Sequence, residues 1–71
     1  MNLDHLRYFK TIAECEHYGR AAEILHVSQP NLNYAVTQLE SELGVPLFEK
    51  AGRNVRLTRY GRLFLQSVTE T

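Results

Sequence analysis

Residues 20–44 read RAAEILHVSQPNLNYAVTQLESELG, and this stretch decides the fold. It holds two segments with apolar residues at helical spacing, a short one over residues 20–25 and a longer one after it. The tripeptide HVS between them is short enough to be a tight turn. Ser28 or Gln29 is expected to cap the second helix, and Pro30 fits its first turn, where a missing N–H loses no intrahelical bond. Two helices joined by a tight turn form a helix-turn-helix unit.

The second of these helices has one apolar stripe and an opposite polar face. The stripe consists of Leu32, Ala35, Val36, Leu39 and Leu43. Gly44 is a candidate C-cap, and Pro46 prevents the helix from continuing. The opposite face follows from a rotation of about 100° per residue. Its members are Pro30, Tyr34, Thr37 and Ser41, flanked by Gln29, Asn31, Asn33 and Gln38.

The segment before this unit is predicted to be an amphipathic helix over residues 3–15, with Asn2 as a possible N-cap. Its apolar positions are Leu3, Leu6, Phe9, Ile12 and Ala13. The following stretch CEHYGR contains Gly19 and interrupts the helical pattern. We therefore expect the short helix of the unit to occupy residues 20–25.

After the unit, the period of the sequence changes from that of a helix to that of a hairpin. Residues 47–50 and 55–57 are strand-like runs around a predicted tip at residues 51–54. Thr58 can cap a final helix, in which Gly61 is expected to be a weak point. The apolar positions of that helix are Tyr60, Leu63, Phe64 and Val68. A hairpin after a helix-turn-helix makes the unit a winged one.

The composition is that of one small globular domain of 71 residues, 44% hydrophobic and 23% charged. Cys15 is the one cysteine of the sequence, so it forms no internal disulfide, and with three scattered histidines it gives no zinc spacing. No apolar run reaches about 18 residues, and the N-terminus has no signal-peptide apolar segment. Ser28 and the nearby His26 have no acid at the spacing of a nucleophilic site. We expect a cytoplasmic protein that is not an enzyme and has no metal and no membrane segment.

The charges of the chain are unevenly distributed although they sum to zero. Residues 1–49 carry three basic and seven acidic side chains, a net charge of −4, whereas residues 50–71 carry five basic and one acidic, a net charge of +4. The basic residues of the second part are Lys50, Arg53, Arg56, Arg59 and Arg62. Such an asymmetry favours a negatively charged partner at the C-terminal third. Arg53, beside Gly52 at the expected tip, suits entry into a minor groove.

The polar face of residues 28–41 carries no Lys or Arg, but it is rich in amides and hydroxyls. Asn and Gln make bidentate contacts with adenine in the major groove, and Thr and Tyr bond phosphates or touch a thymine methyl. Any surface helix has a polar face, so only the combination with the tight turn, the hairpin and the basic C-terminal third favours double-stranded DNA. One alternative stays open, a winged helix that docks a protein partner through this helix or the final one.

Four stretches of the chain resemble the N-terminal DNA-binding domain of the LysR-type transcriptional regulators. They are LRYF at 6–9, RAAEILHVSQP at 20–30, QLESELGVPLFEK at 38–50 and AGRNVRLTRYG at 51–61. The resemblance covers essentially all 71 residues. It implies a mainly α winged helix-turn-helix with three helices, a two-stranded wing and the start of a linker helix.

The resemblance also implies an organisation for the chain and its partners. Residues 1–58 would form the DNA-binding domain and residues 59–71 the start of a linker and dimerisation helix. A recognition helix at about 29–42 would enter the major groove of a pseudo-palindromic operator, and a wing at about 47–57 would touch the minor groove and backbone. Nothing in the last residues stops the final helix, so we expect a fragment without the family's C-terminal effector-binding domain. A small-molecule effector belongs to that domain, and we expect no cofactor here.

Residue patterns and resemblance together give a set of candidate contacts. The DNA-binding candidates are Ser28, Gln29, Pro30, Asn31, Asn33, Tyr34, Thr37, Gln38, Lys50, Arg53 and Arg56. Leu65 and Val68 are expected to serve self-association, as a homodimer and, in the full-length bacterial protein, a tetramer at the nucleoid. Asn33 and Tyr34 stand where the family commonly has Ser and then Arg, which predicts altered base preference and weaker phosphate anchoring. His17 stands where Ser or Asn is common, which predicts a less well-capped second helix.

Overall fold

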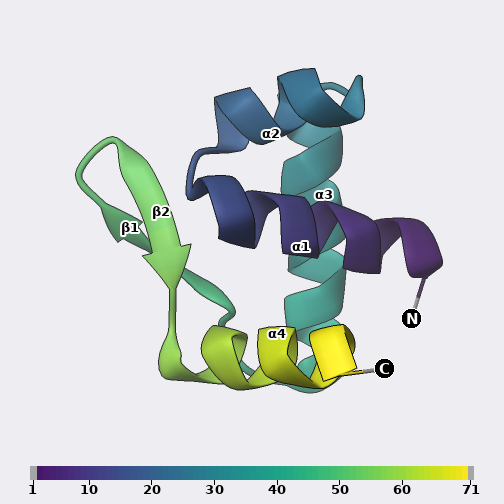
Figure 1. Cartoon of the computed structure of the whole chain (residues 1–71), viewed down its shortest axis with the longest axis vertical. Helices are drawn as coiled ribbons and strands as arrows, with labels where there is room; N and C mark the ends of the chain where they lie inside the picture. The colour runs from purple at the N-terminus through teal and green to yellow at the C-terminus, as the bar shows by residue number, and fades with distance from the viewer. Residues whose placement is uncertain (1, 71) are drawn as a thin grey trace.

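The computed structural model describes residues 2–70, without the side chain of Glu70. Its elements are α1 (Leu3–Cys15), α2 (Tyr18–Leu25), α3 (Gln29–Leu43), β1 (Phe48–Ala51), β2 (Asn54–Leu57) and α4 (Arg59–Glu70). In Figure 1, α1 crosses α3, α2 lies at one end of α3, and the β1–β2 hairpin, the wing, stands to one side. This confirms the predicted mainly α winged helix-turn-helix. None of the helices in this described part has the length and apolar character needed to span a bilayer.

Side chains that accept backbone N–H groups set the starts of the helices. The acceptors are Asn2 Oδ1 for Asp4 N at 2.7 Å, His17 Nδ1 for Arg20 N at 3.0 Å, Ser28 Oγ for Asn31 N at 3.3 Å and Thr58 Oγ1 for Gly61 N at 3.0 Å. The caps expected at Asn2 and Thr58 are thereby confirmed, and of the two candidates Ser28 and Gln29 it is Ser28 that caps α3. Each such cap stabilises its helix by about 1 kcal/mol.

The prediction for the second helix was wrong at its start. α2 begins at Tyr18 rather than at Arg20, and Gly19 lies inside it. The reason is the His17 imidazole, which takes the place of a Ser or Asn cap by accepting the Arg20 N–H. The second helix, expected to be less well capped, does have a side-chain cap, which the His17 imidazole supplies.

The first three helices end at residues in the left-handed backbone region. Glu16, His26 and Gly44 have φ values of 55°, 58° and 74°. Gly44 was the predicted C-cap and is confirmed, since its N–H donates to Glu40 O at 2.8 Å. The turn at Glu16 has a second consequence, because its carbonyl accepts Val55 N–H from the wing at 3.2 Å.

The core consists of two groups of buried side chains, and Phe48 connects them. One group is built on Ile12, Ala21, Leu32 and Val36, and the other on Phe9, Leu39 and Leu47. Phe48, the first residue of the wing, packs against both groups. Its ring centroid lies 5.4 Å from that of Phe9 and 6.2 Å from that of Tyr18. The base of the wing is therefore part of the hydrophobic core.

The wing is an antiparallel hairpin with a two-residue tip. Ala51 pairs with Asn54, so the tip is Gly52 and Arg53 rather than the predicted residues 51–54. Gly52 has a φ of 66°. A glycine with positive φ at the first central position is typical of a type II′ turn, whose twist matches that of the strands. β1 begins at Phe48 instead of at Leu47, which is fully buried in the core group of Phe9 and Leu39.

Gly61 allows α4 to lie directly on the chain that leads into the wing. Its backbone is buried, and an added Cβ would overlap the carbonyl oxygen of Leu47. Thr58 N–H donates to the same carbonyl at 3.0 Å, and the Thr58 hydroxyl donates to Pro46 O at 2.6 Å. A glycine that sequence analysis treats as a weak point of the helix is thus the residue that permits this approach.

Candidate nucleic-acid interface

The predicted polar face of α3 is exposed to solvent. Its exposed members are Gln29, Pro30, Asn31, Asn33, Tyr34, Thr37 and Ser41, whereas Gln38 is half-buried. The amides of Gln29, Asn31 and Asn33 lie in the N-terminal half of the helix, the part that enters the groove in helix-turn-helix proteins. Ser28 Oγ accepts the Asn31 N–H, but a hydroxyl also carries a proton, so Ser28 keeps a donor for an outside acceptor.

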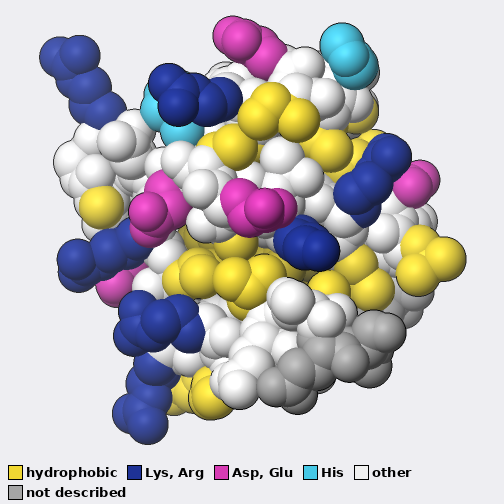
Figure 2. All heavy atoms as spheres, in the orientation of Figure 1, with side chains coloured by type: hydrophobic (Ala, Val, Ile, Leu, Met, Phe, Trp, Pro, Cys, Tyr) yellow, Lys and Arg dark blue, Asp and Glu magenta, His cyan; other side chains and the backbone are white. Residues whose placement is uncertain are grey.

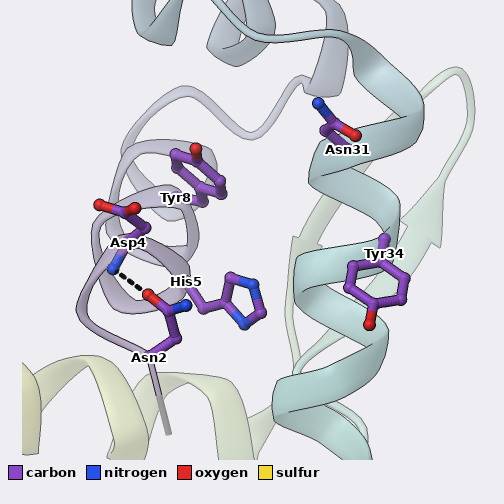
Figure 3. A pocket seen from close by; sticks show the side chains of 6 residues that line it. All are labelled: Asn2, Asp4, His5, Tyr8, Asn31 and Tyr34. Carbon is purple, nitrogen blue, oxygen red and sulfur yellow. Dashed lines mark hydrogen bonds between the residues drawn. The ribbon is translucent and has the colours of Figure 1, made fainter.

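Tyr34 lies beside a shallow hollow between α1 and α3. The hollow has a volume of about 200 Å³ and is lined by Asn2, Asp4, His5, Tyr8, Asn31 and Tyr34. Figure 3 shows the His5 side chain reaching from α1 toward α3. We call this site the α1–α3 hollow. It joins two of the predicted DNA-binding residues, Asn31 and Tyr34, to the first turns of α1, a contact that sequence reasoning missed.

Positive charge is concentrated on the wing and at the start of α4. Lys50, Arg53, Arg56, Arg59 and Arg62 are all exposed. Figure 2 shows Lys and Arg side chains gathered along this edge of the molecule. Arg53 is at the tip, and among residues 2–70 it has no ion-pair partner. The arrangement provides one unpaired guanidinium at the end of a hairpin and further cations toward its base.

Three of the basic residues are engaged within the protein. Arg56 Nε lies 2.9 Å from Glu49 Oε1 in the paired register position, and Arg62 Nη1 donates to Leu57 O at 3.3 Å. The Arg59 guanidinium lies over the Tyr60 ring, 5.9 Å from its centroid. The Arg56–Glu49 pair is exposed and therefore contributes little to stability. Glu49 nevertheless offsets the charge of Arg56, so Arg53 is better placed than Arg56 to attract an anion.

A carboxylate of α3 ties this helix to the base of the wing. Glu40 Oε2 accepts Leu47 N–H at 2.7 Å and Phe48 N–H at 3.5 Å. Burial, and secondly the Glu40 carboxylate, raises the pKa of Tyr18 to about 12, so its hydroxyl is neutral at physiological pH. The two hydrogen bonds from Leu47 and Phe48 to Glu40 hold the base of the wing at a fixed place beside α3. The sequence alone does not single out Glu40 for this role, because Glu42 is a second carboxylate near the end of the same helix.

The predicted self-association residues differ in their surroundings from the most exposed apolar residues of α4. Leu65 is half-buried against the Phe9 group of the core, and Val68 is half-buried. The exposed apolar side chains are Tyr60 at 43% and Leu63 at 62%. They border an apolar hollow of about 280 Å³, whose other lining residues are Leu43, Val45, Leu47 and Phe64.

The chain is similar to a known family and to named transcriptional regulators. The family described as "Bacterial regulatory helix-turn-helix protein, lysR family" matches residues 3–62. The HTH-type transcriptional regulator CatR of Pseudomonas putida is 48% identical over 66 residues, which are 93% of this chain and 22% of CatR. The Hca operon transcriptional activator HcaR of Escherichia coli (strain K12) is also 48% identical over 66 residues, with the same shares of 93% and 22%. The chain thus spans under a quarter of the length of these relatives.

Solved structures show the same arrangement of elements. The CbnR_DBD–DNA complex has a TM-score of 0.93 at 38% identity, covering 99% of this chain and 80% of that one. The BenM_DBD complex with catB site 1 DNA has a TM-score of 0.92 at 38% identity, covering 99% and 78%. The Corynebacterium glutamicum OxyR C206S mutant has a TM-score of 0.90 at 45% identity, covering 97% and 21%.

Proposed function

We propose that this chain, which belongs to the LysR family of bacterial regulatory helix-turn-helix proteins, binds double-stranded DNA in a sequence-specific way. In this proposal α3 lies in the major groove, and the wing lies at the minor groove and backbone. The observation that carries it is an exposed, amide-rich N-terminal half of α3 beside a wing that ends on the unpaired, exposed Arg53. Two structural neighbours are named as complexes of such domains with DNA, which supports the same partner here.

The two parts of the interface supply different contributions. The side chains of Gln29, Asn31 and Asn33 read base edges, where an amide gives bidentate recognition of adenine. Further contacts with the DNA come from the same face, from Thr37, Gln38 and the Ser28 hydroxyl. Arg53 provides the minor-groove contact. The remaining candidates Pro30, Tyr34, Lys50 and Arg56 act by apolar contact with bases or by attraction to phosphate.

The biological role follows from the relatives, which are named transcriptional regulators and a transcriptional activator. We propose regulation of transcription rather than catalysis, by a homodimer on a pseudo-palindromic operator, in the cytoplasm at the nucleoid. α4 would pair the two copies, with Leu65 and Val68 joined by the exposed Tyr60 and Leu63. In a protein of the relatives' length, tetramer formation and response to a small-molecule effector would belong to the residues beyond this domain.

The proposal is tested by letting the protein select its own site from a pool of randomised duplexes. Affinity for the selected duplex and for a scrambled duplex is then measured at several salt concentrations. We expect a preference for the selected duplex, with adenines opposite the amides of α3. We also expect the logarithm of the affinity to fall linearly with the logarithm of salt, by about 0.9 for each phosphate neutralised. Absent or salt-independent binding by the folded protein would overturn the proposal and favour the protein-docking alternative.

Arg53→Ala provides the sharper arm of this test. The DNA proposal expects clear loss of affinity and a salt slope shallower by about 1. Lys10→Ala is the matched control, because Lys10 is an exposed cation on α1, outside both α3 and the wing. A comparable loss in both variants would mean that general positive charge, and not the wing, holds the DNA.

A further inference from the structure

The α1–α3 hollow contains a ring contact that the proposed function does not use. The His5 ring of α1 meets the Tyr34 ring of α3 edge-on, with centroids 6.3 Å apart and an interplanar angle of 83°. On its other side His5 lies 6.4 Å from Tyr8, tilted by 35°. Its Nδ1 is shielded from solvent and has no hydrogen-bond partner among the described residues. His5 is thus held between a core-facing ring and a ring of the polar face (Figure 3).

The contact matters for Tyr34 because that side chain is otherwise on the surface. Tyr34 is 62% exposed. An exposed tyrosine on a helix has more than one staggered rotamer open to it, and an edge-to-face contact favours the one that reaches the partner ring. Asn31 is three positions earlier on the same side of α3 and lines the same hollow. The contact with His5 therefore favours one placement of the Tyr34 ring beside Asn31 and fixes the shape of this part of the recognition face.

A direct phosphate site in the hollow is the competing interpretation, and the charges argue against it. Asp4 brings a negative charge to the lining. Arg7 forms a long ion pair with Asp4, 3.9 Å between Nη2 and Oδ1, and both side chains are mainly exposed. Among the described residues, those that line the hollow include no Lys or Arg. The hollow therefore has little to attract an anion, and its contribution is positional.

We propose that His5 is a positioning residue that holds Tyr34 on the recognition face and thereby sharpens the base preference of the α3 amides. This inference rests on the proposed DNA-binding function. It assigns to α1 a part in sequence discrimination although α1 itself need not touch DNA. An edge-to-face contact of this kind corresponds to about a two- to twelve-fold effect on a binding ratio.

The experiment measures discrimination, the ratio of affinities for the selected and the scrambled duplex, in a cycle of His5→Ala, Tyr34→Ala and the double variant. His5→Ala is expected to lower the ratio about two- to twelve-fold while leaving affinity for the scrambled duplex unchanged. In the Tyr34→Ala background the same change should have no further effect. His5→Phe, which keeps a ring edge without its nitrogens, should restore the ratio. A merely structural role would lower thermal stability and both affinities together.

Each outcome decides between the inferences. The positioning role would be overturned if His5→Ala lowered the affinity ratio equally with and without Tyr34. It would also be overturned if the unaltered protein discriminated between the duplexes and His5→Ala left that ratio unchanged. Either result would leave the DNA proposal intact. Failure of the unaltered protein to prefer any duplex would instead overturn the DNA proposal. If His5→Ala does not fold, His5→Leu fills the space without an aromatic edge, and the same loss of discrimination is expected from it.

Discussion

Replacement of Gly61 by alanine is expected to destabilise the fold, although alanine is the better helix former. Gly61 is in the first turn of α4, and a Cβ there would overlap Leu47 O and lie 2.9 Å from Leu57 Cδ2. The carbonyl is not free to move aside, because it accepts Thr58 N–H at 3.0 Å. Shifting α4 instead would disturb the cap that Thr58 Oγ1 gives to Gly61 N, also 3.0 Å.

One favourable and two unfavourable contributions set the size of this destabilisation. Alanine gains up to about 1 kcal/mol of helix propensity over glycine. Overpacking of a well-filled contact costs about 1–3 kcal/mol, and loosening the two hydrogen bonds at Thr58 costs about 1 kcal/mol for each. The net loss is about 2–4 kcal/mol in the free energy of unfolding. For a domain of this size, that lowers the melting temperature by about 10–30 °C.

Urea unfolding followed by far-UV circular dichroism measures this loss, and Gly19→Ala is the matched control. Gly19 is also helical, but an added Cβ there meets the His17 side chain, 3.0 Å from Cε1, and no backbone. We expect Gly19→Ala to change the free energy of unfolding by less than about 1 kcal/mol. If Gly61→Ala were as stable as the unaltered protein, or if both variants lost equally, the close approach of α4 to Leu47 would not be what requires glycine.

Three further predictions concern the helix cap, the wing and the half-buried Tyr18. His17→Ala should lose about 1 kcal/mol in urea unfolding and His17→Asn should retain most of it, because only the alanine variant leaves Arg20 N–H without a side-chain acceptor. Glu40→Ala should lower the free energy of unfolding by about 1–3 kcal/mol and speed amide hydrogen exchange at Phe48, and Glu40→Gln should have a milder effect. Unchanged exchange at Phe48 would contradict the hydrogen-bonded connection between Glu40 and the wing. The raised pKa of Tyr18, about 12 against 10, means that its folded state holds the proton more tightly, so this stability is present below pH 10 and lost toward pH 12. Tyr18→Phe should flatten that decline in stability, measured by urea unfolding from pH 9 to 12.

The periodic parts of the chain were predictable because their signals are local. The apolar spacing of residues 3–15 and the cap at Asn2 gave the bounds of α1 that the structure has. Ser28, Pro30 and Gly44 gave those of α3 in the same way. In each case the deciding residues lie within one turn of the helix end, so no knowledge of the tertiary structure is needed.

The features that position the interface depend on contacts between distant parts of the chain. Glu40 and the N–H groups it accepts are seven and eight residues apart, across a turn whose path the sequence does not specify. The His5–Tyr34 contact requires the crossing of α1 over α3. The start of α2 was missed for a different reason, since histidine is an uncommon cap and Gly19 next to it resembles a helix breaker. The assignment of individual residues to DNA contacts stays a prediction.

The bond from Val55 N–H to Glu16 O joins the wing to the corner between α1 and α2 through main-chain atoms alone. Such an attachment does not depend on which side chains occupy the two positions. Mutations at the tip or on the exposed face of α3 can therefore accumulate while the hairpin keeps its place. For a regulator that acquires new operators, this separates the evolution of sequence preference from the evolution of geometry.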